Sequence, residues 1–272
     1  MLSPEFYNTV MDHNHGKIQT KTVYINGKAR AISMYTDKDQ EIHRMIKDVF
    51  WKDFRKRFSP NCYAYVKGKS CVDAIIEINK RVRSYEGYIR TDIKNFFPSI
   101  STRILGDILR KNYPDDFVDK VLSFVSVGRV GISQGSALSP LLSNIYLIGF
   151  DKTLATTSRY YRYSDDILIL CDNSFIETTL ASIDAELHSL LLTRNIEKTH
   201  SGEISIGFQY LGFFICEKGA SAALNKKTEL DAKIQDICAE GHSTIKERMD
   251  KMRQSIVGWQ NYYHEKYSIP YT

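Results

Sequence analysis

The stretch YYRYSDDILIL, residues 160–170, places two adjacent carboxylates, Asp165 and Asp166, between two apolar runs that favour β-strands. Almost nothing in it can serve as a conventional turn, so we expect the pair at the tip of a tight hairpin. Neighbouring carboxylates in such a place repel each other and lose hydration, and a divalent cation offsets this cost. A solvated Asp-Asp turn is the ordinary alternative, and the pair alone does not decide between the two.

A second short strand also ends in a carboxylate. Residues 88–92 read YIRTD, and Asp92 precedes Asp165 by 73 residues, which leaves room for a helix or two and a return strand. If the two strands lie side by side, their carboxylates can bind two Mg²⁺ ions and leave room for phosphate oxygens. Such a site suits phosphoryl transfer, in which an attacking hydroxyl and a leaving oxygen both need charge stabilisation.

Several short motifs follow one another from about residue 20 to residue 215. They are NGKARAI (26–32), KGKS (67–70), DIKNFF (92–97), GISQGSALSPLLSNIYL (131–147), YSDD (163–166), NIEKT (195–199) and YLGF (210–213). Each is weak alone, but together they are specific: they resemble the motifs of reverse transcriptases and follow the order found in that family.

The resemblance implies an α+β fold, a right-hand polymerase whose palm is an antiparallel sheet backed by helices. We expect fingers at 1–84, a palm at 85–218 with fingers insertions between 101 and 135, and a helical thumb at 219–272. The implied activity is RNA-templated DNA polymerisation, in which dNTPs are added by two-Mg²⁺ phosphoryl transfer.

Hydrophobic periodicity predicts the individual elements of this fold. The Asn26-Gly27 pair predicts a tight hairpin turn between two strands within 20–33. Helices are expected at 39–57, 70–82, 138–154 and about 175–190, strands at 61–67 and within 204–216, and a linker from Gly219 onward.

The family's roles can be carried over to the catalytic residues of this chain. Asp92, Asp165 and Asp166 would hold the two Mg²⁺ ions, with the carbonyl of Ile93 as a further ligand, and Mn²⁺ as a substitute metal. For Asp166, a role only in shaping the turn is the alternative.

Five residues are expected at the incoming nucleotide. Phe97, five positions after Asp92, would close sterically against the ribose 2′ position and exclude ribonucleotides; a core phenylalanine is the alternative. Arg30 and Lys28 would reach the triphosphate from the fingers. Gln134 suits the nucleotide or the template, and Lys198 could act as general acid toward pyrophosphate. For these cations a solvated surface position is the alternative.

Two further groups of residues are expected to hold nucleic acid. Tyr210, Leu211 and Gly212 would position the primer end, with Tyr163 packed beneath. In the tail, apolar residues recur at spacings of three and four from 245 to 263, which predicts an amphipathic helix. Its Lys246, Lys251 and Arg253, together with Lys69 in the fingers, would contact the nucleic-acid backbone, unless they only form a solvated face.

Composition agrees with a globular protein that binds a polyanion. The net charge is +5 with 37 basic and 32 acidic residues, a mild bias that many soluble proteins share. No apolar stretch approaches the length of a membrane span, and residues 1–17 contain no signal-peptide run. The absence of such runs leads us to expect a cytoplasmic protein without a membrane partner. The resemblance implies a bacterial protein whose partners are an RNA template, its DNA product and dNTPs.

The branch within the family rests on departures from known patterns. DAIIE at 73–77 departs from the Asn-Ala-x-x-His element of retron enzymes, and GWQNYY at 258–263 resembles only the start of a maturase domain. These departures favour a defence-associated enzyme that copies a dedicated, structured noncoding RNA against phage. The alternatives are a retron or group II intron-type reverse transcriptase, an RNA-dependent RNA polymerase, and a non-catalytic RNA-binding protein.

Overall fold

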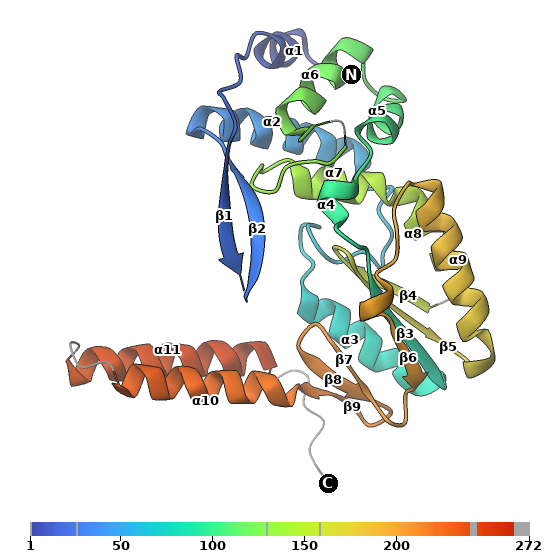
Figure 1. Ribbon diagram of the computed structural model, residues 1–272, viewed down its shortest axis with the longest axis vertical. Coiled ribbons are helices and arrows are strands. Elements are labelled where there is room, and N and C mark those ends of the chain that lie inside the picture. The colour runs from blue at the N-terminus through green and yellow to red at the C-terminus, as the bar shows by residue number, and fades with distance from the viewer. Residues whose placement is uncertain (1, 26, 129, 158, 240–243, 264–272) are drawn as a thin grey trace.

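The computed structural model describes residues 2–25, 27–128, 130–157, 159–239 and 244–263. It is a mixed helix and sheet structure with antiparallel sheets (Figure 1). No helix in these ranges combines the length and the apolarity that are needed to cross a lipid bilayer.

A four-stranded antiparallel sheet forms the centre of the molecule. Its strands, in spatial order, are β4 (Arg159–Tyr163), β5 (Asp166–Cys171), β3 (Gly87–Asp92) and β6 (His200–Glu203). The two strands predicted to end in carboxylates are therefore neighbours, and the register pairs Asp92 with Asp166. The antiparallel pairing of β4 with β5, in which Tyr163 lies opposite Asp166, confirms the expected hairpin at 160–170.

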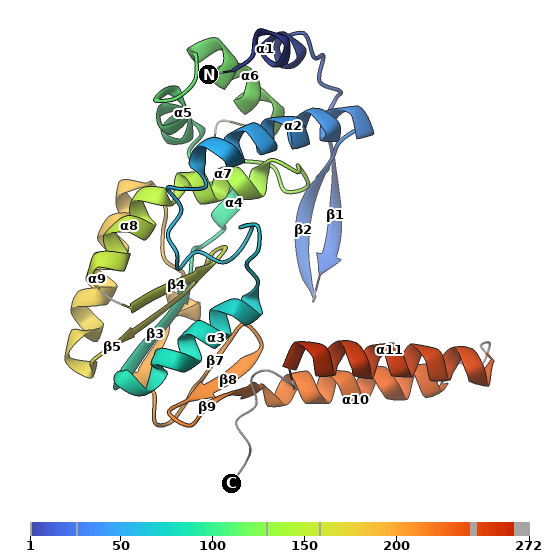
Figure 2. The ribbon, with the colours of Figure 1, turned by 180° about the vertical axis from the view of Figure 1, so that it is seen from behind.

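The two faces of this sheet are covered by different layers, because alternate side chains of β5 point to opposite sides. Ile167 and Ile169 join the core beneath α7 (Ser139–Tyr146), α8 (Ile148–Thr157) and α9 (Ile176–Ser189). Leu168 and Leu170 join a second cluster. It is shared with α3 (Cys71–Arg81) and with the small sheet β7 (Phe208–Tyr210), β8 (Phe213–Cys216) and β9 (Gly219–Ala222) (Figures 1 and 2).

The N-terminal part joins a protruding hairpin to a group of helices. Strands β1 (Gln19–Ile25) and β2 (Lys28–Met34) form the hairpin, which extends away from α2 (Asp37–Phe54) (Figure 1). Thr36 and Asp39 form a reciprocal capping box that begins α2. The other elements here are α1 (Pro4–Met11), α4 (Phe96–Ser99), α5 (Thr102–Arg110) and α6 (Asp115–Val125).

The tail forms an antiparallel pair of long helices, α10 (Leu224–Ala239) and α11 (Ile245–Tyr263), which project from the small sheet (Figures 1 and 2). A capping box begins α11: the Thr244 hydroxyl accepts from the Glu247 amide at 3.2 Å, and the Glu247 carboxylate accepts from the Thr244 amide at 2.8 Å. At the C-terminal end of α11, the centre of the Tyr263 ring lies 5.0 Å from that of the Phe213 ring, and this contact joins the helix to β8.

Three sequence predictions are wrong in this structure. The expected strand at 61–67 is a series of turns with a single bridge from Cys62 to Arg162, and Tyr65 adopts a φ of 60° that no strand allows. The expected helix at 138–154 is broken at Leu147, where ψ is 5°. The expected linker after Gly219 pairs with β8 as strand β9.

The first hairpin agrees with its prediction. Ile25 pairs with Lys28 and Gly27 has a φ of 73°, as a two-residue turn requires. Asn26 lies outside the described residues. The predicted division into fingers, palm and thumb stays a prediction.

Candidate active site

Asp92 and Asp165 come together where β3 ends and β4 turns into β5. The amide of Ile93 donates to the carbonyl of Asp165 at 3.3 Å, which joins the two segments directly after Asp92. The turn depends on Ser164, whose φ of 60° is unusual for a residue with a side chain. Two carboxylates remote in the sequence therefore lie at one place.

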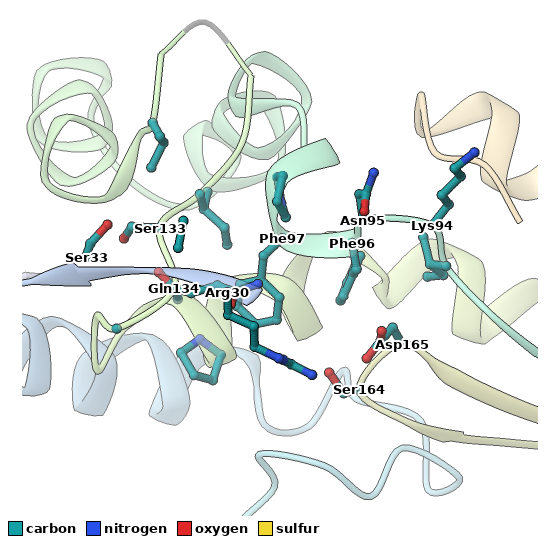
Figure 3. A pocket seen from close by; sticks show the side chains of 18 of the residues that line it. Arg30, Ser33, Lys94, Asn95, Phe96, Phe97, Ser133, Gln134, Ser164 and Asp165 are labelled. Carbon is teal, nitrogen blue, oxygen red and sulfur yellow. The ribbon is translucent and has the colours of Figure 1, made fainter. Parts of the chain in front are cut away.

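Both carboxylates line a cavity of about 840 Å³. Figure 3 shows part of its wall, including Asp165. Strand β2 supplies Arg30 to its wall, α4 supplies Phe97, and the loop before α7 supplies Gln134. Figure 3 shows the Arg30 side chain extending toward the turn that carries Ser164 and Asp165. The structure thus gathers Asp92 and Asp165 around one space with four of the predicted nucleotide-binding residues, Arg30, Phe97, Gln134 and Lys198.

Asp166 does not line this cavity, although it pairs with Asp92 in the ladder. It is the first residue of β5, close to Arg90 and Tyr210; its backbone oxygen accepts from the Tyr210 hydroxyl at 3.1 Å. Among the described residues, no group of three or more His, Cys, Asp or Glu side chains is arranged to hold a metal. The expected cage of three aspartates is therefore not formed here; two carboxylates share the cavity.

The electrostatics of the pair nevertheless suit a bound cation. Oδ1 of Asp92 is buried without a hydrogen-bond partner, while Lys198 contacts Oδ2. Burial raises the pKa of Asp165, and the charge of Asp92 raises it further. Burial and the adjacent Asp165 raise the pKa of Asp166 to about 6. An acceptor oxygen without a donor, beside a second destabilised carboxylate, fits a hard divalent cation whose other ligands are substrate oxygens.

The loop that carries Gln134 is held by β2 and α2. The amide of Ser33 in β2 donates to the Gln134 carbonyl at 2.6 Å. Gly135 adopts a φ of 117°, and a Cβ there would lie 2.2 Å from the Ser33 oxygen, so only glycine allows this approach. From α2, the Gln40 amide donates to the Gly135 carbonyl at 2.7 Å and accepts from the Ala137 amide at 3.0 Å.

The predicted primer grip lies next to the turn that carries Asp165. Tyr210 is buried, and its hydroxyl reaches the backbone of Asp166. Leu211 and Gly212 form the turn between β7 and β8 with φ angles of 50° and 84°. Tyr163 is half-buried and packs against the hydrophobic cluster that contains Tyr210, Leu168 and Leu170. The predicted contact of these residues with a primer stays a prediction.

The predicted backbone-binding cations occupy two different settings. Lys69 contacts the carbonyl of Pro60 and donates to that of Cys62 at 3.1 Å, and burial lowers its pKa. Its ammonium group is therefore engaged with the protein itself. The other three are exposed on α11: Lys246, Lys251 and Arg253. The side chain of Lys28 lies outside the described structure, so its role stays a prediction.

Sequence reasoning missed three residues near the site. Gln40 is an ordinary surface type on an amphipathic helix, and nothing local distinguishes it. Tyr65 lines the cavity with 47% of its surface exposed, in the segment that was wrongly expected to be a strand. Arg162 is completely buried behind the turn. A cation inside a predicted buried strand was an available signal, because such a charge needs partners.

Comparison with known proteins gives the following similarities. A family model described as reverse transcriptase (RNA-dependent DNA polymerase) matches residues 3–215. The "Putative COX1/OXI3 intron 1 protein" of Saccharomyces cerevisiae is 29% identical over 143 residues, which is 47% of this chain and 17% of that protein. "Protein YkfC" of Escherichia coli is 22% identical over 270 residues, which is 77% of this chain and 70% of that protein.

Similarity to a solved structure concerns the fold. The structure of telomerase from Candida albicans, in complex with a TWJ fragment of telomeric RNA, has a TM-score of 0.59 to this chain at 11% identity. The match covers 93% of this chain and 55% of that one. This chain spans less than a fifth of the yeast intron protein, so the activity of that whole protein does not transfer by similarity alone.

Proposed function

Because this chain belongs to the reverse transcriptase family, we propose that it extends a DNA strand on an RNA template by adding deoxynucleotides. The observation that carries the proposal is the convergence of Asp92 and Asp165, from separate strands, on a cavity that also receives Arg30, Phe97 and Gln134. A protein that only bound RNA would have no need to bury two repelling carboxylates together.

In this proposal Asp92 and Asp165 hold divalent ions, which reverse transcriptases use, with the carbonyl of Ile93 as a further ligand. We propose two Mg²⁺ ions, with Mn²⁺ able to substitute. When bound, such ions lower the pKa of a hydroxyl nucleophile and neutralise phosphate charge. Asp166, beside the pair, adds negative charge that strengthens the attraction for these cations.

The other side chains position the substrates. Arg30 presents a planar fork to the triphosphate from the fingers, and Lys28 adds charge from the same strand. Phe97 closes against the sugar and excludes a 2′-hydroxyl. Lys198 can release a proton to pyrophosphate after exchanging its contact with Asp92. Gln134 contacts the nucleotide or the template base.

The nucleic acids are assigned to the remaining surfaces. The β7–β8 turn with Tyr210, Leu211 and Gly212 supports the primer end. Lys246, Lys251 and Arg253 contact the duplex backbone from α11, which projects from the palm as an exposed cationic helix. A contact of this kind weakens with added salt, because counterions are released on binding.

Primer extension tests this function directly. The wild-type chain should extend a DNA primer on an RNA template only when a divalent cation is present. Asp165→Asn should lower the rate by at least about 100-fold, since even residues that merely orient metal ligands contribute that much. Full incorporation by Asp165→Asn would reject the site, and wild-type preference for NTPs over dNTPs would favour an RNA polymerase.

The finer proposal is that the template is a dedicated structured noncoding RNA and that the enzyme works in anti-phage defence in the bacterial cytoplasm. The departure of residues 73–77 from the retron pattern supports it. The intron-encoded relatives favour the alternative, an intron-type enzyme of a mobile element. Sequencing the RNA that copurifies with the chain decides: an intron RNA would contradict the defence role.

A further inference from the structure

Arg162 is the largest completely buried side chain of the molecule's described part, and it lies directly behind the catalytic turn. It belongs to β4, two residues before Ser164. A wholly buried guanidinium has to find acceptors for its five N–H groups, because an unpaired buried donor is costly.

All five N–H groups of Arg162 have acceptors. Nε and Nη2 form a fork on the Asp151 carboxylate, at 2.7 and 2.6 Å. Nη2 also reaches the Cys62 sulfur at 3.2 Å, and Nη1 donates to Oδ1 of Asn144 at 3.0 Å. The last donor, again from Nη1, binds the backbone carbonyl of Ser164 at 2.9 Å.

The partners of Arg162 come from four separate segments. Asn144 lies on α7, Asp151 on α8 and Cys62 in the loop that pairs with β4, and all three are buried. The guanidinium is therefore anchored on helices that pack under the sheet. Its single contact with the turn carries that rigidity to the peptide between Ser164 and Asp165.

That peptide needs support. Ser164 is held at a φ of 60°, a conformation that costs a residue with a Cβ about 1 kcal/mol or more. The orientation of the same peptide plane sets where the Asp165 side chain leaves the backbone and hence how it faces Asp92. The carboxylate pair itself opposes this arrangement, since two carboxylates that line one cavity repel each other.

We propose that Arg162, anchored by Asp151, is a positioning residue that holds the Ser164 carbonyl so that Asp165 faces Asp92 across the cavity. The inference rests on the proposed function. It extends that function to a buried ion pair that touches neither substrate nor metal. Arg162 acts only through the turn, and its removal should loosen the cation site while the nucleotide-contacting side chains stay in place.

Arg162→Lys tests this, because lysine keeps the charge opposite Asp151 but lacks the planar fork that reaches Ser164 and Asn144. We expect a fall of about 10- to 100-fold in Mn²⁺ affinity and in kcat, the range for residues that orient metal ligands, with KM for dNTP little changed. Mn²⁺ binding is followed by electron paramagnetic resonance on the free protein, so this readout does not depend on activity.

Tyr160→Phe is the matched control. The Tyr160 hydroxyl donates to Asp151 at 2.7 Å in the same buried network, but it does not touch the turn. This variant should lose stability and keep the wild-type Mn²⁺ affinity and kcat. Equal Mn²⁺ affinity in Arg162→Lys and wild type, or equal weakening in the control, would overturn the proposal.

A second variant covers the case in which Arg162→Lys does not fold. Ser164→Val leaves the ion pair intact but disfavours the left-handed backbone, because a β-branched residue rarely adopts it. It should weaken Mn²⁺ binding, and an Mn²⁺ affinity equal to that of the wild type would contradict the inference. Failure of the wild-type protein itself to bind Mn²⁺ would instead contradict the proposed metal site.

Discussion

The ammonium group of Lys198 contacts Oδ2 of Asp92, whereas Oδ1 of the same buried carboxylate has no partner. Lys198 ends a short 3₁₀ turn at Ile196–Lys198, and the amide of Asn195 just before it donates to the Asp92 carbonyl at 2.9 Å. The segment is thus tied to β3 by both backbone and side chain. The charge of Lys198 therefore stabilises one of the two carboxylate oxygens of Asp92.

Replacing Lys198 by methionine should therefore have two separable effects. Without metal the melting temperature should fall, because Asp92 loses its cation; added Mg²⁺ should restore it more than in wild type. Incorporation of dNTP should fall by about 100-fold, as for the loss of a general acid. Thermal melts in EDTA and in MgCl₂, with single-turnover rates, measure both.

Lys94→Met is the control, since Lys94 lines the cavity without an ion pair to Asp92 in the described structure. If Lys94→Met showed the same two effects, the role assigned to Lys198 would be contradicted.

The pH dependence of stability should carry a signature of Asp166. Burial and the charge of Asp165 raise its pKa from 3.8 to about 6 in the folded protein. Between these pH values the native state binds more protons than the unfolded state. The free energy of unfolding should therefore fall as pH rises from about 4 to about 6, by up to about 3 kcal/mol.

Asp166→Asn isolates this effect. Urea denaturation in EDTA, repeated at several pH values from 4 to 7, should show the wild type losing stability relative to the variant as pH rises. Added divalent cation should reduce the difference, because it favours the ionised carboxylates. Parallel curves for the two proteins would show that Asp166 has an ordinary pKa.

Phe97 should determine sugar selectivity. It is half-buried on α4 at the cavity wall, and Phe97→Ala should raise the efficiency of NTPs relative to dNTPs by about 10-fold or more, within the range of steric discrimination by a pocket. Single-nucleotide extension with paired dNTP and NTP measures the ratio. The adjacent Phe96 is 3% exposed, and Phe96→Leu should lower stability without changing that ratio. If only Phe96→Leu changed the ratio of NTP to dNTP efficiency, Phe96 and not Phe97 would determine sugar selectivity.

Gln40 should act on the nucleotide through the loop it holds. Gln40→Ala removes both hydrogen bonds to the backbone of Gly135 and Ala137, each contributing about 1 kcal/mol. We expect a higher KM for dNTP with little change in primer binding, measured by steady-state extension and fluorescence anisotropy. Gln40→Glu keeps the acceptor for Ala137 and loses the donor to Gly135. Its KM for dNTP should therefore lie between those of the wild type and Gln40→Ala. An unchanged KM for dNTP in both variants would show that Gln40 of α2 does not affect nucleotide binding.

Much of the site was predictable because its residues lie at points that local patterns mark. Asp92 ends one predicted strand and Asp165 follows another, and the continuous apolar run at 167–170 predicted that β5 is buried. The order of the motifs then indicated which segments should meet. Helix α11 was equally predictable, since its apolar spacing and its capping box at Thr244 and Glu247 are local features.

Other features depend on partners that local patterns do not identify. The segment 61–67 has the composition of a strand, but its neighbour is the outer edge of β4, and only one bridge forms there. The helix from Leu138 breaks at Leu147 where α7 ends and α8 begins, and each of these helices carries one partner of Arg162. The strand β9 exists because β8 offers it a free edge.

By itself, the sequence determined which residue types stand at strand ends, which faces are apolar and in what order the chemical groups occur. Period and spacing act over a few residues, and they are written in the chain. Only the tertiary structure decided that Lys198 contacts Asp92, that Gln40 forms hydrogen bonds with the loop of Gln134, and that Asp166 does not line the cavity. These contacts join segments up to about a hundred residues apart, and their geometry follows from how whole layers pack against each other.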